Sequence, residues 1–177
     1  LMEYRRPTAK FVRPEVVAEK IRELDKRAYI DFPVNRTELN PLYRRNPEQL
    51  DSIIKTINTL KEDKNLTVLA VNIHGFASPE GRYESNDRLA KGRAQTLMEY
   101  VQRMVRLDKD LFSVSHTAED WDGLRKFIAE SNMEHKQQIL DIANDTSIKE
   151  DEREAKIKTA FADEYKFLLA ACYPALR

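Results

Sequence analysis

The chain of 177 residues has little of what defines several common protein classes. A single cysteine, Cys172, excludes an intramolecular disulfide. Lys plus Arg and Asp plus Glu both number 30, so a formal charge of zero gives no global electrostatic case for binding nucleic acid or an anionic membrane. No apolar run approaches the ~20 residues that a membrane-spanning helix needs. We therefore expect no nucleic-acid partner and no membrane span in this chain.

Motifs that carry catalysis or metal binding are also missing. The sequence holds no Walker phosphate loop, no Gly-x-Gly-x-x-Gly and no Gly-x-Ser-x-Gly. His74, His116 and His135 lie far apart without metal-ligand spacing, and Cys172 has no adjacent histidine to activate it. Cys172 lies in an apolar helical stretch, which predicts burial as a small hydrophobe. We predict that the protein is not an enzyme and has no catalytic residue, no metal and no cofactor.

Periodic apolar residues predict alternating strands and helices. The predicted strands cover 10–12, 28–32, 65–76 and 111–115. The predicted helices cover 14–24, 46–60, 83–104 and 121–128, followed by helical chain to 172 with breaks near Ser131 and 144–147. Such alternation indicates α/β crossover units, here a mixed sheet of about four strands with helices packed on it and further C-terminal helices.

Several local patterns sharpen these predictions. The near-continuous apolar run before Phe76 predicts a central strand buried on both faces, with His74 as a satisfied imidazole. Asn46 and Thr117 stand where helix caps are expected, Thr117 opening a capping-box pattern. Trp121 is predicted to be a core residue, with sugar stacking as the alternative. The expected inner face of the 83–104 helix is Ala90, Ala94, Leu97, Val101 and Met104.

The most informative stretch runs from Ile73 to Val101, where three of only four glycines gather. Asn86 and Arg93 are seven positions apart on a predicted helix and therefore share one face. An arginine near a strand end and a loop rich in backbone N–H groups suits bidentate capture of a carboxylate. Taken by themselves, the residues leave open that Arg93 is a surface residue paired with Glu84 or Glu99.

Residues 86–97 resemble the Asn-x-x-Leu-Ser-x-x-Arg-Ala-x-x-Val helix of the OmpA-like family, with Ala90 in place of Ser and Leu97 in place of Val. Residues 30–32 look like the first strand of that family, and Gly75-Phe76 like its Gly-Tyr before the binding loop. The match covers about residues 28–116. It implies a β-α-β-α-β sandwich there, with residues 1–27 as a lead-in and 117–177 as a helical extension of the same globule.

The resemblance implies non-covalent binding of peptidoglycan through its stem peptide. In the family a loop Asp holds the ammonium of diaminopimelate and the helix Arg holds a carboxylate. The Arg falls on Arg93 and the Asn on Asn86, but the Asp position falls on uncharged Ser78, so Glu80 is the candidate replacement. The expected ligand-binding residues are Arg93, Asn86, Ser78, Glu80, Phe76 and Ala77.

The Ala-Ser-Pro-Glu-Gly loop is similar to that of a subgroup of OmpA-related envelope proteins, as are residues 119–124 and 173–177. This likeness implies a fragment of a larger protein at the periplasmic face of the outer membrane. Ser78 and the helical extension also favour an alternative. In that alternative the chain is a protein–protein interaction module that kept the fold, lost diaminopimelate binding and has an envelope protein as its partner.

Overall fold

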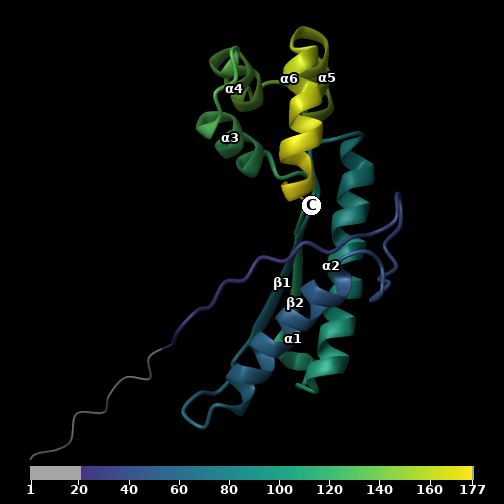
Figure 1. The fold of residues 1–177 in the computed structure, drawn as a ribbon, viewed down its shortest axis with the longest axis vertical. Coiled ribbons are helices and arrows are strands. Elements are labelled where there is room, and N and C mark those ends of the chain that lie inside the picture. The colour runs from purple at the N-terminus through teal and green to yellow at the C-terminus, as the bar shows by residue number, and fades with distance from the viewer. Residues whose placement is uncertain (1–20, 177) are drawn as a thin grey trace, which may run out of the picture.

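The computed structural model describes residues 21–176, which form a mixed α/β fold with a two-stranded parallel sheet (Figure 1). The elements are α1 (Asn46–Glu62), β1 (Val71–Phe76), α2 (Tyr83–Val105), β2 (Phe112–Thr117), α3 (Trp121–Glu130), α4 (Lys136–Asn144), α5 (Glu150–Ala160) and α6 (Ala162–Phe167). A short π-helical turn, Leu168–Cys172, and a 3-10 turn, Tyr173–Leu176, follow α6. Helices α3 to α6 gather at the end of the sheet where both strands finish (Figure 1).

The sheet pairs β1 with β2 in parallel, from Val71 opposite Phe112 to Phe76 opposite Thr117. Helix α2 packs closely on one face of the sheet. A Cβ added to Gly75 of β1 would lie only 2.6 Å from the carbonyl oxygen of Ala90 in α2. Exposure alternates along β1, so the prediction of a strand buried on both faces is wrong. A two-residue period is the mark of a sheet covered on one face only.

His74 lies on the open face and is exposed, not buried. Its ring nitrogens are nevertheless satisfied, since Nδ1 is 2.6 Å from the Ser115 hydroxyl and Nε2 is 2.7 Å from the Thr117 hydroxyl. The prediction that the His74 imidazole is hydrogen-bonded is confirmed, but the prediction that it is buried is wrong. Use of Thr117 in the strand also explains why it does not cap a helix: Asp120 is the cap of α3 and accepts a hydrogen bond from Gly123 N at 2.9 Å.

The predicted four-stranded sheet is absent from residues 21–176, where only β1 and β2 pair. The predicted strand over 65–76 begins only at Val71, because that residue is the first with a partner in β2. Residues 21–24 are not helical, and 28–32 form no strand. The predicted strand 10–12 and most of the predicted helix 14–24 lie outside the described residues.

Residues 28–32 are tied to α1 instead. The fully buried Asn46 accepts a hydrogen bond from Asp31 N at 2.7 Å and donates to the carbonyls of Asp31 and Asn40. Because the Asn46 amide makes these tertiary contacts, Asn46 does not cap α1 as predicted. Arg45 occupies the N-cap position of α1 and makes no side-chain capping hydrogen bond. The side chain thereby fixes a segment that precedes α1 against the start of that helix.

The buried face of α2 differs slightly from the predicted one. Ala90, Ala94 and Val101 are buried as expected, but Met104 is 48 % exposed and Val105 takes its place. Leu97 is half-buried. The predicted residues follow a mean spacing slightly below the 3.6-residue period of a helix, so the error accumulates toward the C-terminal turn.

The C-terminal helices enclose a second core. It comprises Trp121, Leu124, Ile128, Ile139, Ala143, Ile157, Tyr165, Leu168, Cys172, Tyr173 and Leu176. Trp121 is a core residue, as predicted, and burial raises the pKa of the Cys172 thiol to about 12, in keeping with a structural cysteine. The predicted helix breaks are confirmed, since α3 ends at Glu130 and α4 at Asn144. No helix within 21–176 is both long and apolar enough to cross a bilayer.

Candidate functional site

The candidate site lies where the parallel strands end, the edge at which open α/β sheets commonly bind ligands. The loop after β1 and the segment Ala118–Asp120 after β2 meet there. A backbone hydrogen bond from Asp120 N to Ala77 O, 2.9 Å long, joins the two segments. Ala77 and Ser78 are buried, and Glu80 is exposed.

Asn86 holds this loop in place from the first turns of α2. Its side-chain nitrogen donates to the carbonyls of Ser78 at 3.2 Å and Glu80 at 3.0 Å, and to Glu119 Oε1 at 2.9 Å. The residue is only 7 % exposed. An amide NH₂ group has two protons, so these three acceptors use its full donor capacity. Asn86 is therefore a loop-positioning residue, and its donors face the protein itself.

Glu119 is a buried carboxylate that the sequence did not single out as part of this site. Besides Asn86 at Oε1, its Oε2 accepts a hydrogen bond from Trp121 Nε1 at 2.7 Å. Burial raises the pKa of Glu119, while the bonds from Asn86 and Trp121 lower it and nearby Asp151 and Glu154 raise it. The network links the loop after β1 to the start of the C-terminal core, through residues 33 positions apart.

The raised pKa of Glu119 gives a prediction with a defined sign. The folded protein holds this proton more tightly than the unfolded chain, so Glu119 makes the folding free energy less favourable as pH rises from 4.5 through the folded-state pKa. Glu119→Gln cannot titrate. Urea denaturation at pH 4.5 and pH 7 should show the variant gaining stability relative to the parent at the higher pH. An unchanged or opposite difference would contradict the burial of this carboxylate.

Asp120 and Phe76 are bridged by Arg27, from the predicted lead-in. Arg27 Nη2 lies 3.3 Å from Asp120 Oδ2, and its guanidinium carbon lies 5.3 Å from the centre of the Phe76 ring. Phe76 is thus half-buried beneath a cation of the protein itself. No local spacing signals this contact, because 93 positions separate Arg27 from Asp120.

Arg93 contacts a different part of the chain, the segment before α1. Its Nε donates to the Arg36 carbonyl at 3.0 Å, and its guanidinium carbon lies 5.0 Å from the centre of the Phe32 ring. Thr96 Oγ1 donates to the Thr37 carbonyl at 2.8 Å, which fixes the same segment against α2. The Arg93 side chain is half-buried and has further contacts. Its place on α2 is two turns, ~10 Å, beyond Asn86.

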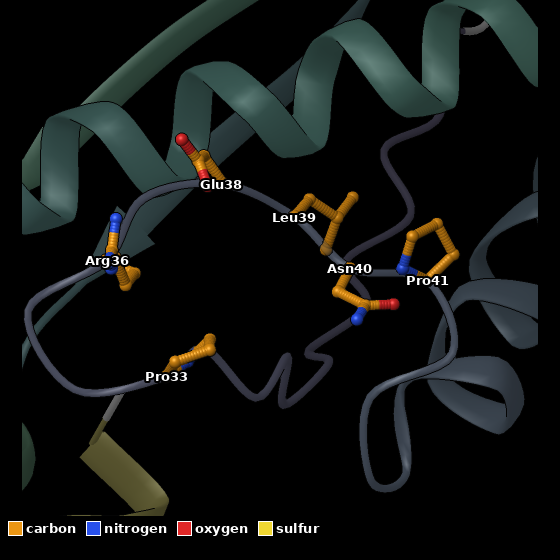
Figure 2. Close-up of a pocket in the computed structure, with 6 residues that line it drawn as sticks. All are labelled: Pro33, Arg36, Glu38, Leu39, Asn40 and Pro41. Carbon is orange, nitrogen blue, oxygen red and sulfur yellow. The ribbon is translucent and has the colours of Figure 1, made fainter.

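A shallow pocket adjoins the Arg93 contact. It is lined by Pro33, Arg36, Glu38, Leu39, Asn40 and Pro41. Figure 2 shows these side chains spread along one curved loop that runs beside α2. Arg36 belongs to both features, because its carbonyl accepts from Arg93 and its residue lines the pocket.

Helix α5 contacts the loop that follows β1. Tyr83 N donates to Asp151 Oδ1 at 2.7 Å, and Gly81 N donates to Glu154 Oε1 at 3.3 Å. The Tyr165 hydroxyl also donates to Glu154 Oε1, at 2.5 Å. Two backbone N–H groups at the start of α2 are therefore bound by carboxylates from more than 65 positions along the chain.

The predicted site residues thus lie in two separate groups. It joins Asn86 to Ser78 and Glu80 through hydrogen bonds, and it places Arg93 against Phe32 and Arg36. No local spacing points to Glu119, Asp151, Glu154 or Arg27, because their roles depend on contacts between distant segments. Among residues 21–176, no group of three or more His, Cys, Asp or Glu side chains is arranged to hold a metal ion.

No protein-family model matches the chain, and no curated protein matches it significantly.

Proposed function

We propose that this chain is a non-catalytic, OmpA-like binding domain that attaches a bacterial outer-membrane-associated protein to peptidoglycan from the periplasmic side. The sequence pattern of residues 86–97 supports the family, and the described β1-α2-β2 unit is compatible with its fold. The finer architecture, a sheet of about four strands, is part of the proposal. The described sheet is supported by α2 on one face, and β1 and β2 each have an outer edge at which a further strand can pair.

One observation carries the ligand proposal: the Arg93 side chain is oriented by its contacts with Phe32 and with Arg36, a residue that lines a pocket. The bond from Nε to the Arg36 carbonyl and the packing on Phe32 restrict the plane of the guanidinium. Orientation of this planar group before binding is what bidentate carboxylate recognition requires. A stem-peptide carboxylate would share or replace the other contacts of Arg93, and the pocket that Arg36 helps to line offers room for the peptide.

The partner for the diaminopimelate ammonium is proposed to be Glu80. Ser78 stands at the family's Asp position, but it is uncharged and buried. Glu80 is exposed, and Asn86 holds its backbone carbonyl at 3.0 Å. The loop that carries this carboxylate is therefore well anchored while its side chain reaches solvent. Glu80 has contacts of its own, which the ammonium would join or replace.

Arg93→Ala tests the proposal. Charge-assisted hydrogen bonds contribute about 1.5–3 kcal/mol, so the affinity for purified sacculi should fall roughly tenfold or more. Co-sedimentation of the full chain with sacculi over a range of sacculus concentrations measures this loss. Arg103→Ala is the matched control, because Arg103 is an exposed arginine on the same helix that packs on Tyr100. Equal binding by both variants and the parent would contradict a role for Arg93.

A second candidate, the protein–protein interaction module, is favoured by a specific observation. The donors of Asn86 and two backbone N–H groups of the loop are already bound by the protein's own oxygens. A domain that no longer binds the wall ligand is expected to bond these donors to its own oxygen atoms. Failure of the parent protein to sediment with sacculi, together with capture of a defined envelope protein, would support this second function.

A further inference from the structure

A series of buried hydrogen bonds runs from the C-terminal core to the loop after β1. The Trp121 indole N–H donates to Glu119 Oε2 at 2.7 Å, and Glu119 Oε1 accepts from the Asn86 side chain at 2.9 Å. Asn86 also donates to the backbone carbonyls of Ser78 and Glu80. Trp121, Glu119 and Asn86 are each no more than 7 % exposed. These three residues are called the loop network below.

The Trp121 indole is fixed by the C-terminal core. The guanidinium carbon of Arg153 lies 4.6 Å from the centre of the Trp121 ring, and Arg153 is 5 % exposed. Arg153 is itself held by the Ala143 carbonyl at 3.2 Å and by Glu150 Oε1 at 3.0 Å. A ring that is packed in a core and covered by a held cation has little freedom to turn. Its N–H is therefore a fixed donor to Glu119.

The Glu119 carboxylate uses both oxygens in this network, one for Trp121 and one for Asn86. A buried polar group that loses its partner is destabilised by the cost of its desolvation. Loss of the indole donor therefore makes the Glu119 side chain turn or take up a proton. Either change weakens the charge-assisted bond to Asn86, which is stronger than a bond between neutral groups. The Asn86 amide is then less restrained at the loop carbonyls.

We propose that Trp121 and Glu119 are positioning residues of the stem-peptide site: through Asn86 they set the conformation of the 78–80 loop, which presents Glu80 to the ligand ammonium. This inference rests on the proposed function for the identity of the ligand. Both residues are buried and act through the loop, without touching the peptide. The C-terminal helical extension is thus a working part of the site, and the preference of the domain for an ammonium group depends on it.

The carboxylate contact of the ligand is independent of the loop network. Arg93 is held by the Arg36 carbonyl and the Phe32 ring, which belong to the segment before α1. Loss of the network should therefore weaken recognition of the ammonium and leave recognition of the carboxylate unchanged. A residue with a role in folding alone would weaken both to the same extent, so the two roles can be separated by measurement.

The test compares two stem tripeptides that differ only at the third residue. One contains diaminopimelate, and the other contains α-aminopimelate, which keeps the side-chain carboxylate and lacks the ammonium. Calorimetry gives the affinity of the full chain for both peptides in the parent, Trp121→Phe and Glu119→Gln. Phe keeps an aromatic ring without the N–H donor, and Gln keeps the size of Glu without its second acceptor oxygen.

Ile128→Val is the matched control, because Ile128 is fully buried on the same helix as Trp121 and lies outside the loop network. A second readout needs no ligand. The Glu80 N–H donates to the Ser78 carbonyl at 2.7 Å, so its amide hydrogen exchange reports how well the loop is held.

We expect the parent to bind the diaminopimelate stem roughly tenfold more tightly than the α-aminopimelate stem, as for one charge-assisted hydrogen bond. Trp121→Phe and Glu119→Gln should reduce this ratio to about threefold or less and speed amide exchange at Glu80. Their affinity for the α-aminopimelate stem should stay within about twofold of the parent value, since independent sites add. Ile128→Val should keep the parent ratio and the parent exchange at Glu80.

A full parent ratio in both Trp121→Phe and Glu119→Gln would overturn the positioning role. A parent protein that binds neither stem, or binds both equally, would contradict the proposed function. Exchange at Glu80 then decides the positioning role alone: faster exchange in both variants but not in Ile128→Val supports it, and unchanged exchange overturns it.

Discussion

Gly75→Ala is expected to destabilise the protein by about 3 kcal/mol, at the upper end of the usual cost of overpacking. The added Cβ would lie 2.6 Å from the Ala90 carbonyl oxygen and 2.8 Å from the Ala94 Cβ. Neither neighbour is the tip of a flexible side chain, so α2 as a whole must move away from β1. The midpoint of urea denaturation measures the loss.

Gly81→Ala provides the comparison for this effect. A Cβ on Gly81 meets nothing within 4 Å, and its cost comes from the positive φ of 85° alone. That conformation costs a non-glycine residue about 1–2 kcal/mol. The expected order of stability is therefore parent, Gly81→Ala, Gly75→Ala. A Gly75→Ala protein as stable as Gly81→Ala would contradict the close packing of α2 on the sheet.

Asn86→Asp is expected to cost about 3–5 kcal/mol at neutral pH, although the side chain keeps its size. The substitution replaces a donor with an acceptor that faces the carbonyls of Ser78 and Glu80 and the carboxylate of Glu119. A buried charge without a partner carries a penalty of this order. Lower pH should recover part of the loss, because protonation removes the added charge and restores one donor.

Asn72→Asp is the control for Asn86→Asp. Asn72 is exposed on β1 and accepts a hydrogen bond from the Ser113 hydroxyl, which a carboxylate also accepts. We expect a change within about 0.5 kcal/mol, as for most surface substitutions. Chemical denaturation at pH 4.5 and pH 7 compares the two variants. Similar stability of both would show that Asn86 does not hold the loop as described.

Sequence patterns within a few residues predicted several helices and strands correctly. Helix α1, helix α2 and strand β2 lie close to their expected bounds, because apolar spacing and β-branched runs act within a few residues. The strand expected at residues 28–32 shows the limit. A strand exists only when another strand pairs with it, and Asn46 of α1 takes the Asp31 backbone groups instead.

The candidate site shows the same limit more strongly. The sequence grouped Asn86, Ser78 and Glu80 as ligand-binding residues, and hydrogen bonds join Asn86 to the backbone carbonyls of the other two. It did not predict Glu119 at Asn86, nor Glu154 at Gly81, since these contacts depend on how the C-terminal helices fold back. The Glu119 carboxylate had a simpler local interpretation as part of the capping-box pattern that opens at Thr117, which hid its tertiary role.

The most direct measurement of the central claim follows the side-chain Nε–H resonance of Arg93 during titration with a diaminopimelate-containing stem peptide. We predict a saturable shift at Arg93 together with a silent Arg103, because Arg93 bonds the carbonyl of Arg36, a residue that lines the pocket, whereas Arg103 packs on Tyr100. An Arg93 resonance that stays unchanged throughout the peptide titration, or a shift of equal size at Arg103, would contradict this prediction.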